Sequence, residues 1–219
     1  MKKLLVFDLN GTLSDDGGAQ LIAVNAVLEA LNQKEISLER LRETMSIPPS
    51  NLYITNGCNS SELEVRGDEL GKLFFSVFNR ELLEVVAIKN AVKVLNWLKE
   101  KEIPFVILTN YPRKGNEKFL CEFFERLGFG DFFNSLLAIS GNEKYGDCPK
   151  LKLLNYYLES HPEHEEIVMI GDGLEEIEIA EILKGVSIAF TSGYYSRKRL
   201  ESAGADYVID DLIQIKNII

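Results

Sequence analysis

The feature that most constrains the fold is a short apolar run near the amino terminus, Leu4-Leu5-Val6-Phe7, which ends at Asp8. Its residues do not alternate with polar ones, which is typical of a strand buried on both faces of a parallel sheet. Asn10-Gly11 follows and is a strong turn signal, because both residues tolerate backbone conformations that others avoid. Asp8 is therefore expected at the carboxyl end of a core strand, where open α/β sheets bind ligands. The next step, Gly11-Thr12, lets the backbone approach a bound group and offers amide donors to an anion.

Further strands are predicted after Ala87, at residues 105–108, 136–139, 167–170, 186–189 and 207–209. Helical segments separate them, so the expected fold class is α/β, with a doubly wound, mostly parallel, Rossmann-like sheet. Several strands end on polar residues, and in a parallel sheet such ends share one edge. The residues that could converge there are Asp8, Thr109, Ser140, Asp172, Thr191 and Asp210.

Between the first two strands, residues 16–86 have the character of helices. Apolar residues recur at helical intervals within residues 21–31 and 70–78. Ser61-Glu62-Leu63-Glu64 has the form of a capping box, which predicts the start of another helix. The predicted organisation is a core of residues 1–15 and 87–219, with an all-helical insertion of residues 16–86.

Composition narrows the classes of partner. The chain has 219 residues, 46% of them hydrophobic, so it can bury a sizeable interior. A net charge of −10, without a long run of Lys or Arg, argues against nucleic acid as a partner. No apolar stretch approaches the ~18 residues of a membrane span. Three unpaired cysteines indicate a reducing compartment, so a cytoplasmic protein is expected. His161 and His164 are interpreted as solvated loop residues.

The segment Asp8-Leu9-Asn10-Gly11-Thr12 resembles the first motif of the haloacid dehalogenase-like phosphohydrolases, Asp-x-Asp-Gly-Thr, with Asn10 in place of the second Asp. In that family the first Asp attacks a phosphoryl group and becomes an aspartyl phosphate, and the second is the general acid and base. The strand that ends in Thr109-Asn110 is similar to the second motif, which binds phosphoryl oxygens. The strand that ends in Gly171-Asp172 is similar to the fourth motif, whose carboxylate ligates Mg²⁺.

Two further assignments follow from the resemblance. The third motif is a lysine that holds the nucleophile and the phosphate, and Lys150, 22 positions before Asp172, is the candidate; Lys152 and Lys144 are alternatives. A second acid usually follows four residues after the fourth-motif Asp. Glu176 occupies that position, with Glu175 beside it, and a solvated acidic helix start is an equally good interpretation of this pair.

The end of the chain carries the most specific likeness. Phe190-Thr191-Ser192-Gly193-Tyr194, followed by residues 203–212, closely resembles the tail of phosphoglycolate phosphatase-like members, which carry a helical cap after the first motif. The resemblance therefore predicts a Mg²⁺-dependent phosphatase for a small phosphorylated metabolite, acting as a monomer or homodimer. It implies metal ligation by Asp8, the main-chain carbonyl of Asn10, Asp172 and Glu176. It implies substrate binding by Gly11, Thr12, Thr109, Asn110 and Lys150.

Asn10 leaves the function open. An amide neither protonates a leaving alkoxide nor deprotonates an attacking water, and the loss of such a group typically costs about 10²–10⁴ in rate. The alternatives are a catalytically weak phosphate-ligand binding or regulatory protein on the same fold, or an engineered substitution at Asn10.

Overall fold

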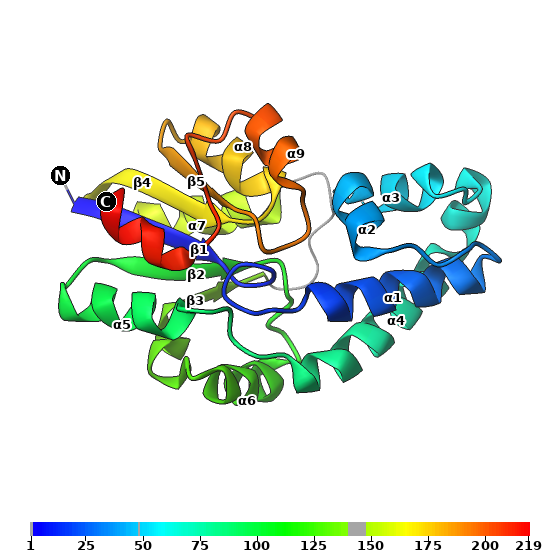
Figure 1. The fold of residues 1–219 in the computed structure, drawn as a ribbon. Coiled ribbons are helices and arrows are strands. Elements are labelled where there is room, and N and C mark those ends of the chain that lie inside the picture. Colours follow the sequence, from blue (N-terminus) through cyan, green and yellow to red (C-terminus); the bar gives the residue numbers. More distant parts are fainter. Residues whose placement is uncertain (1, 48, 140–147) are drawn as a thin grey trace.

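The sheet is built outward from the amino-terminal strand. The computed structural model describes residues 2–47, 49–139 and 148–219. Six strands form one sheet in the order β3-β2-β1-β4-β5-β6, and every pairing is parallel (Figure 1). The strands are β1 (Lys2–Asp8), β2 (Phe105–Thr109), β3 (Leu136–Ala138), β4 (His164–Gly171), β5 (Val186–Phe190) and β6 (Tyr207–Ile209).

Helices cover both faces of this sheet, and β1 is apolar on both. Leu4 and Val6 pack with the side of α7 and α8, whereas Leu5 and Phe7 pack with the side of α5 and α6. All four side chains are fully buried, which is why this strand shows no polar alternation. The covering elements are α5 (Ala91–Glu100), α6 (Glu117–Leu127), α7 (Pro149–Ser160), α8 (Leu174–Ile182), α9 (Arg197–Ser202) and the 3₁₀ segments η2 (Gly130–Ser135) and η3 (Leu212–Asn217).

The strand order reverses beside β1. The chain runs from β1 to β2 and β3 on one side, and then crosses to β4, β5 and β6 on the other. Doubly wound sheets bind ligands at such a switch point, outside the carboxyl ends of the strands. Asp8 ends β1, and Asp172 directly follows β4 at the same edge. The predicted doubly wound α/β class is confirmed, with an all-parallel sheet.

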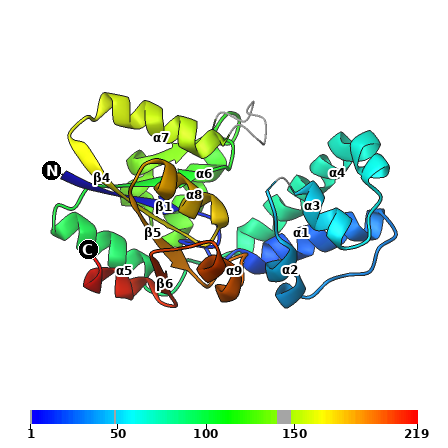
Figure 2. The same cartoon turned by 90° about the horizontal axis from the view of Figure 1, so that it is seen from above.

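A group of helices between β1 and β2 lies to one side of the sheet (Figures 1 and 2). We call α1–α4 the helical insertion; its elements are α1 (Gly17–Ala30), α2 (Leu38–Thr44), α3 (Ser50–Thr55) and α4 (Ser60–Glu81), with η1 (Leu82–Glu84) after them. Helix α1 packs along α4. The capping box predicted at Ser61 is wrong in position: α4 begins at Ser60, and its N-cap is Asn59, whose side chain accepts from the Ser61 amide at 2.8 Å.

The insertion leaves and rejoins the core through neighbouring segments. Ser14 and Ala87 form an antiparallel bridge. The Asp15 amide donates to the Val86 carbonyl at 2.9 Å, and the Ile88 amide donates to the Leu13 carbonyl at 2.8 Å. The outgoing and returning segments are therefore bonded to each other beside the carboxyl end of β1.

Two arginines join the insertion to the core in opposite directions. Arg42 of α2 donates to the carbonyls of Gly193 and Ser192, at 2.9 and 2.8 Å. Arg199 of α9 donates to the carbonyls of Arg42 and Met45, at 2.9 and 2.7 Å. Both guanidinium groups thus bind main-chain oxygens across the interface, where the charge-assisted bonds do not depend on the partner side chains.

Two smaller sequence interpretations are tested elsewhere in the fold. His164 is not a solvated loop residue, because it begins β4 with a side chain only 5% exposed and its ring lies parallel to Tyr157. None of the helices in the described part of the chain is long and apolar enough to cross a membrane.

Candidate active site

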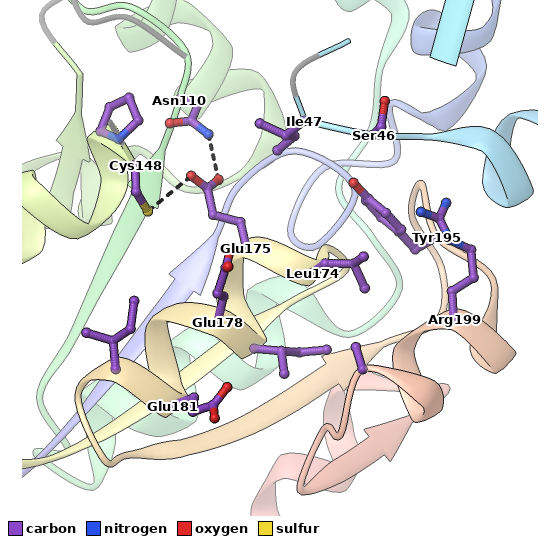
Figure 3. A pocket seen from close by; sticks show the side chains of 14 residues that line it. Ser46, Ile47, Asn110, Cys148, Leu174, Glu175, Glu178, Glu181, Tyr195 and Arg199 are labelled. Carbon is purple, nitrogen blue, oxygen red and sulfur yellow. Dashed lines mark hydrogen bonds between the residues drawn. The ribbon is translucent and has the colours of Figure 1, made fainter. Parts of the chain in front are cut away.

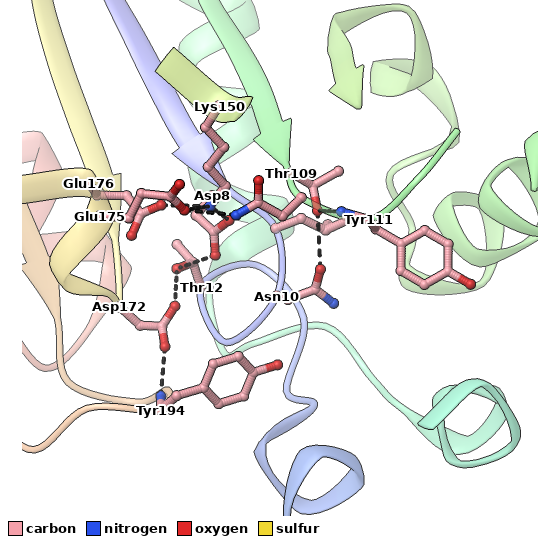
Figure 4. Close-up of polar contacts among 12 residues, drawn as sticks. Asp8, Asn10, Thr12, Thr109, Tyr111, Lys150, Asp172, Glu175, Glu176 and Tyr194 are labelled. Atoms are coloured by element: carbon pink, nitrogen blue, oxygen red, sulfur yellow. Dashed lines mark hydrogen bonds and ion pairs between the residues drawn. The ribbon is translucent and has the colours of Figure 1, made fainter. Parts of the chain in front are cut away.

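A buried lysine and two carboxylates meet at the end of β1 (Figure 4). Lys150 lies in the first turn of α7, and its Nζ is 2.6 Å from Asp8 Oδ1 and 2.6 Å from Glu176 Oε1. Glu175 Oε2 lies farther away, at 3.7 Å from Nζ. Lys150 is only 5% exposed, and Lys is almost never buried to this degree unless it is paired.

Asp172 lies on the other side of Asp8, and Thr12 connects the two. The Thr12 hydroxyl is 3.4 Å from Asp8 Oδ2 and 3.2 Å from Asp172 Oδ1. The Tyr194 amide donates to Asp172 Oδ2 at 2.6 Å. The Asp172 carboxylate is therefore held by one donor from the turn after β1 and another from the loop after β5.

Two glycines leave room for this carboxylate. Gly11 has φ +80°, and a Cβ atom there would lie 2.7 Å from Asp172 Oδ2. A Cβ atom on Gly193 would lie 1.9 Å from the same oxygen. A side chain at either position would displace Asp172. Gly193 also accepts a hydrogen bond from Arg42, so the loop that Arg42 binds packs directly against Asp172.

Burial of so many acids changes their proton affinity. Burial raises the pKa of Asp8 to about 7, although Lys150 acts in the opposite direction. Burial and the nearby Asp8 raise the pKa of Asp172 well above its ordinary value. Burial alone would lower the pKa of Lys150, but Asp8 and Glu176 raise it well above its ordinary value. The lysine therefore stays charged among carboxylates that lack compensating positive charge.

Asn10 is fixed from both ends of its amide. Its Oδ1 accepts from the Thr109 hydroxyl at 3.2 Å, and its Nδ2 donates to the carboxylate of Asp16. Asp16 is fully buried and also accepts from Tyr194 OH at 2.7 Å and from Ser14 Oγ at 3.0 Å. Burial raises the pKa of Asp16 to about 6.

Asn110 lines a cleft between the insertion and the core, beside Glu175 (Figure 3). Its Nδ2 donates to Glu175 Oε2 at 2.7 Å. Its Oδ1 is buried without a hydrogen-bond partner among the described residues. The cleft, of about 580 Å³, is lined by Ser46 and Ile47 of the insertion side and by core residues that include Asn110, Cys148, Glu175, Tyr195 and Arg199.

The structure brings most residues of the predicted site together. Asp8, Thr12, Lys150, Asp172 and Glu176 form one contact network. Gly11 and Asn10 border it, Thr109 reaches it through Asn10, and Asn110 reaches it through Glu175. Lys152 is exposed, and Lys144 lies outside the described residues.

Sequence reasoning missed Asp16 and the backbone amide of Tyr194. Asp16 stands in the run Asp15-Asp16-Gly17-Gly18, which has the composition of a solvated connection. The available signal was its place directly before a helix that starts close to the first motif.

Fold and site together define a doubly wound α/β protein with an acidic centre at the switch point and a helical insertion after the first strand. The chain belongs to the haloacid dehalogenase-like hydrolases, because the model of that family matches residues 2–182. The expected family is thus confirmed.

Its curated relatives include phosphoglycolate phosphatases. The chain is 24% identical over 235 residues to phosphoglycolate phosphatase of Vibrio parahaemolyticus, a match that covers 99% of this chain and 96% of the relative. It is 23% identical over 216 residues to the enzyme of that name from Pseudomonas savastanoi, with coverage of 97% and 78%. The homology is distant and spans the whole chain.

Solved structures share the fold. A predicted phosphatase from Clostridium acetobutylicum superimposes with a TM-score of 0.77 at 21% identity, over 100% of this chain and 98% of that one. A predicted phosphoglycolate phosphatase from Haemophilus somnus gives a TM-score of 0.71 at 22% identity, over 99% and 97%. At these identities the likeness concerns the fold.

Proposed function

We propose that the protein is a Mg²⁺-dependent phosphatase that hydrolyses a small phosphomonoester through an aspartyl phosphate on Asp8. The observation that carries this proposal is the buried Lys150, 2.6 Å from Asp8 at the switch point of the sheet, with Thr12 joining Asp8 to Asp172. A fixed carboxylate beside a permanent positive charge suits attack on an anionic phosphoryl group. The family and the phosphoglycolate phosphatase relatives support the same reaction class.

The donor set fits Mg²⁺. Among the described residues, no three His, Cys, Asp or Glu side chains form a ready metal cluster. Mg²⁺ is usually held by only one or two carboxylates and keeps several waters, and Asp8 with Asp172 supplies such a pair. Burial is the main reason that the pKa values of both carboxyls are raised, and a divalent cation would stabilise their ionised forms. We assign Asp8, Asp172 and the Asn10 carbonyl to this ion, and Glu176, through water, as a supporting group. When bound, the ion reduces repulsion between the nucleophile and the substrate.

The protein's own groups then divide the work. A bond forms between an Asp8 carboxylate oxygen and phosphorus while the bond to the leaving oxygen breaks, and the leaving oxygen takes a proton from solvent. Water later attacks the phosphorus, loses a proton to solvent and releases Asp8 and phosphate; Asn10 carries neither proton. Lys150 holds Asp8 and a phosphoryl oxygen. We assign Thr109, Asn110 and the Thr12 amide to the remaining oxygens; the Gly11 amide already donates to the Ser14 carbonyl at 3.0 Å.

Access to Asp8 supports a cap function for residues 16–86. Asp8 is 6% exposed, and the Asn110–Glu175 contact stands between it and the cleft. Substrate therefore enters when these side chains and the insertion move, and closure then excludes water. The substrate class we propose is a small phosphorylated metabolite, phosphoglycolate-like or related, handled by a cytoplasmic monomer or homodimer.

The second candidate is a phosphate-ligand binding protein with weak catalysis, and Asn10 favours it. The site assembles without an acid at this position, so binding is expected to survive even where alkyl ester hydrolysis is slow. Nitrophenolate needs no proton in order to leave, so a nitrophenyl phosphate should be hydrolysed more readily than an alkyl phosphate.

The test is a screen of small phosphomonoesters with and without Mg²⁺, together with binding of beryllofluoride, a phosphoryl mimic. We expect the mimic to bind only with Mg²⁺ and to be lost in Asp8→Ala and Asp172→Ala. Mimic binding without ester hydrolysis would identify a binding protein. Mimic binding that survives both substitutions would refute the site.

A further inference from the structure

Asp16 is a buried carboxylate to which neither the family motifs nor the reaction gives a role. It stands at the N-cap of α1, where Asp normally accepts from an amide of the first helical turn. Its side chain makes no such capping bond. Instead Oδ2 accepts from Asn10 Nδ2 and Ser14 Oγ, and Oδ1 accepts from Tyr194 OH. The carboxylate therefore serves the site rather than the helix.

The hydrogen bonds around Asn10 form a chain in which each group donates to the next, from the Tyr111 amide through Thr109 and Asn10 to Asp16. The Tyr111 amide donates to Thr109 Oγ1 at 3.0 Å, so the single hydroxyl proton of Thr109 is free to be given to Asn10 Oδ1. At the other end of the amide, Asn10 Nδ2 donates a hydrogen bond to Asp16, whose carboxylate can only accept when it is ionised. This order of donors determines which way the Asn10 amide faces.

We propose that Asp16 is a positioning residue that fixes the Asn10 side chain and, through it, the Thr109 hydroxyl. Its contact also makes position 10 a site for an amide rather than a carboxylate. An Asp at position 10 would bring two carboxylates into contact with no donor between them, and Asp16 has no solvent exposure to disperse the charge. The catalytic part of this inference rests on the proposed phosphatase function, whereas the contact itself does not.

The contact between Asn10 and Asp16 predicts that a carboxylate is tolerated at position 10 only when position 16 carries an amide. Asn10→Asp alone should raise the unfolding equilibrium constant by about 10- to 100-fold, the usual consequence of leaving buried polar groups unpaired. The exchange N10D/D16N restores one donor and one carboxylate, so it should return the constant to within about threefold of the parent. Asp16→Asn alone should be nearly neutral, because the amide oxygen at position 16 still accepts from Asn10.

Urea unfolding in EDTA measures all three variants without any bound ion. Asp15→Asn is the matched control, because Asp15 is the adjacent carboxylate and is exposed. It should change neither stability nor activity. A second readout is turnover of an alkyl phosphate and of nitrophenyl phosphate with Mg²⁺. The exchanged pair should hydrolyse the alkyl ester at least about tenfold faster than Asn10→Asp, through kcat and with KM unchanged.

The outcomes separate the two proposals. If Asn10→Asp is as stable as the parent, or if adding Asp16→Asn does not rescue it, Asp16 does not constrain position 10 and the inference is overturned. If the stability cycle shows the rescue but no variant hydrolyses any ester, the positioning contact is supported and the phosphatase function fails. Rescue of both stability and alkyl ester turnover supports the whole inference.

Discussion

The end of β1 and the helical insertion are held by opposite kinds of contact. At the end of β1, Asp8, Glu176 and Lys150 are buried and charged, and each depends on the identity of the other side chains. Across the interface with the insertion, Arg42 and Arg199 bind main-chain carbonyls, beside an apolar cluster that both parts share. Substitutions should therefore have severe effects on activity at the first region and moderate effects on stability at the second.

Asp8→Asn is the substitution expected to have the largest effect on activity at the end of β1. We expect kcat to fall by at least about 10⁴-fold, because an amide is not a competent nucleophile. The free energy of unfolding of the metal-free protein should change little, since burial disfavours the charged Asp8 carboxylate and Lys150 keeps Glu176 as a partner at 2.6 Å. Steady-state kinetics and urea unfolding measure the two effects. Activity within tenfold of the parent would place the nucleophile elsewhere.

Lys150→Met removes the positive charge that lies between Asp8 and Glu176; among the described residues, no other cation contacts these two acids. Removing it leaves Asp8 and Glu176 buried without their partner, and breaking such a network costs about 3–5 kcal/mol. Binding of beryllofluoride should be lost as well. Lys152→Met, two residues along the same helix and exposed, is the control and should be near neutral. Equal small effects from both would argue for a solvated role and direct attention to Lys144.

Arg42→Ala tests the insertion side. It removes two hydrogen bonds to the Ser192-Gly193 backbone, so we expect a loss of about 1–2 kcal/mol in unfolding free energy. Because that loop holds Asp172 through the Tyr194 amide, Mg²⁺ affinity, measured by calorimetry, should also weaken severalfold. Arg40→Ala is the control: Arg40 binds Asn56 and Thr55 inside the insertion, and its loss should leave Mg²⁺ affinity unchanged. The same affinity in both variants would mean that the interface does not act on the site.

The smallest effect concerns Glu175, which bonds Asn110 and lies 3.7 Å from Lys150. A carboxylate there competes with a phosphoryl group for both partners. Glu175→Gln should tighten the binding of a phosphate analogue by roughly threefold to tenfold, because it removes one negative charge while the glutamine can still bond Asn110. Glu178→Gln, on the exposed face of α8, should leave affinity unchanged. Weaker binding in Glu175→Gln would show that Glu175 helps to hold the ligand.

The sequence predicted the fold well because the central strands of this sheet are buried on both faces. β1 has an unbroken apolar run that ends where the strand ends, and the same holds for β2 at Thr109. Lys150 was placed from the family spacing, and it lies beside Asp8. The spacing of 22 residues between Lys150 and Asp172 is a family pattern that can be read along the chain, although Lys150 and Asp8 themselves lie 142 residues apart.

The parts that the sequence did not reveal depend on distant partners. Asp16 is buried by Tyr194, which lies 178 residues later in the chain, and no local pattern records that pairing. The contact between Asn110 and Glu175 likewise joins the loop after β2 to the first turn of α8, which only the folded sheet brings together. Two nearby residues are able to cap α4, and Asn59, which stands before Ser61, is the N-cap of the helix that begins at Ser60.

The bridge between Ser14 and Ala87 has a consequence for how such a protein can change over evolution. The chain leaves the core and returns to it at nearly one point, so everything between forms a loop that is closed at its base. The entropic cost of closing a loop rises only with the logarithm of the loop's length, so each doubling of that length costs about 0.6 kcal/mol. The cost of loop closure therefore allows helices to be gained, lost or exchanged beyond this junction, provided that the arginine contacts and the shared apolar cluster are kept or replaced. A lineage can in this way acquire a new substrate while it inherits its chemistry unchanged.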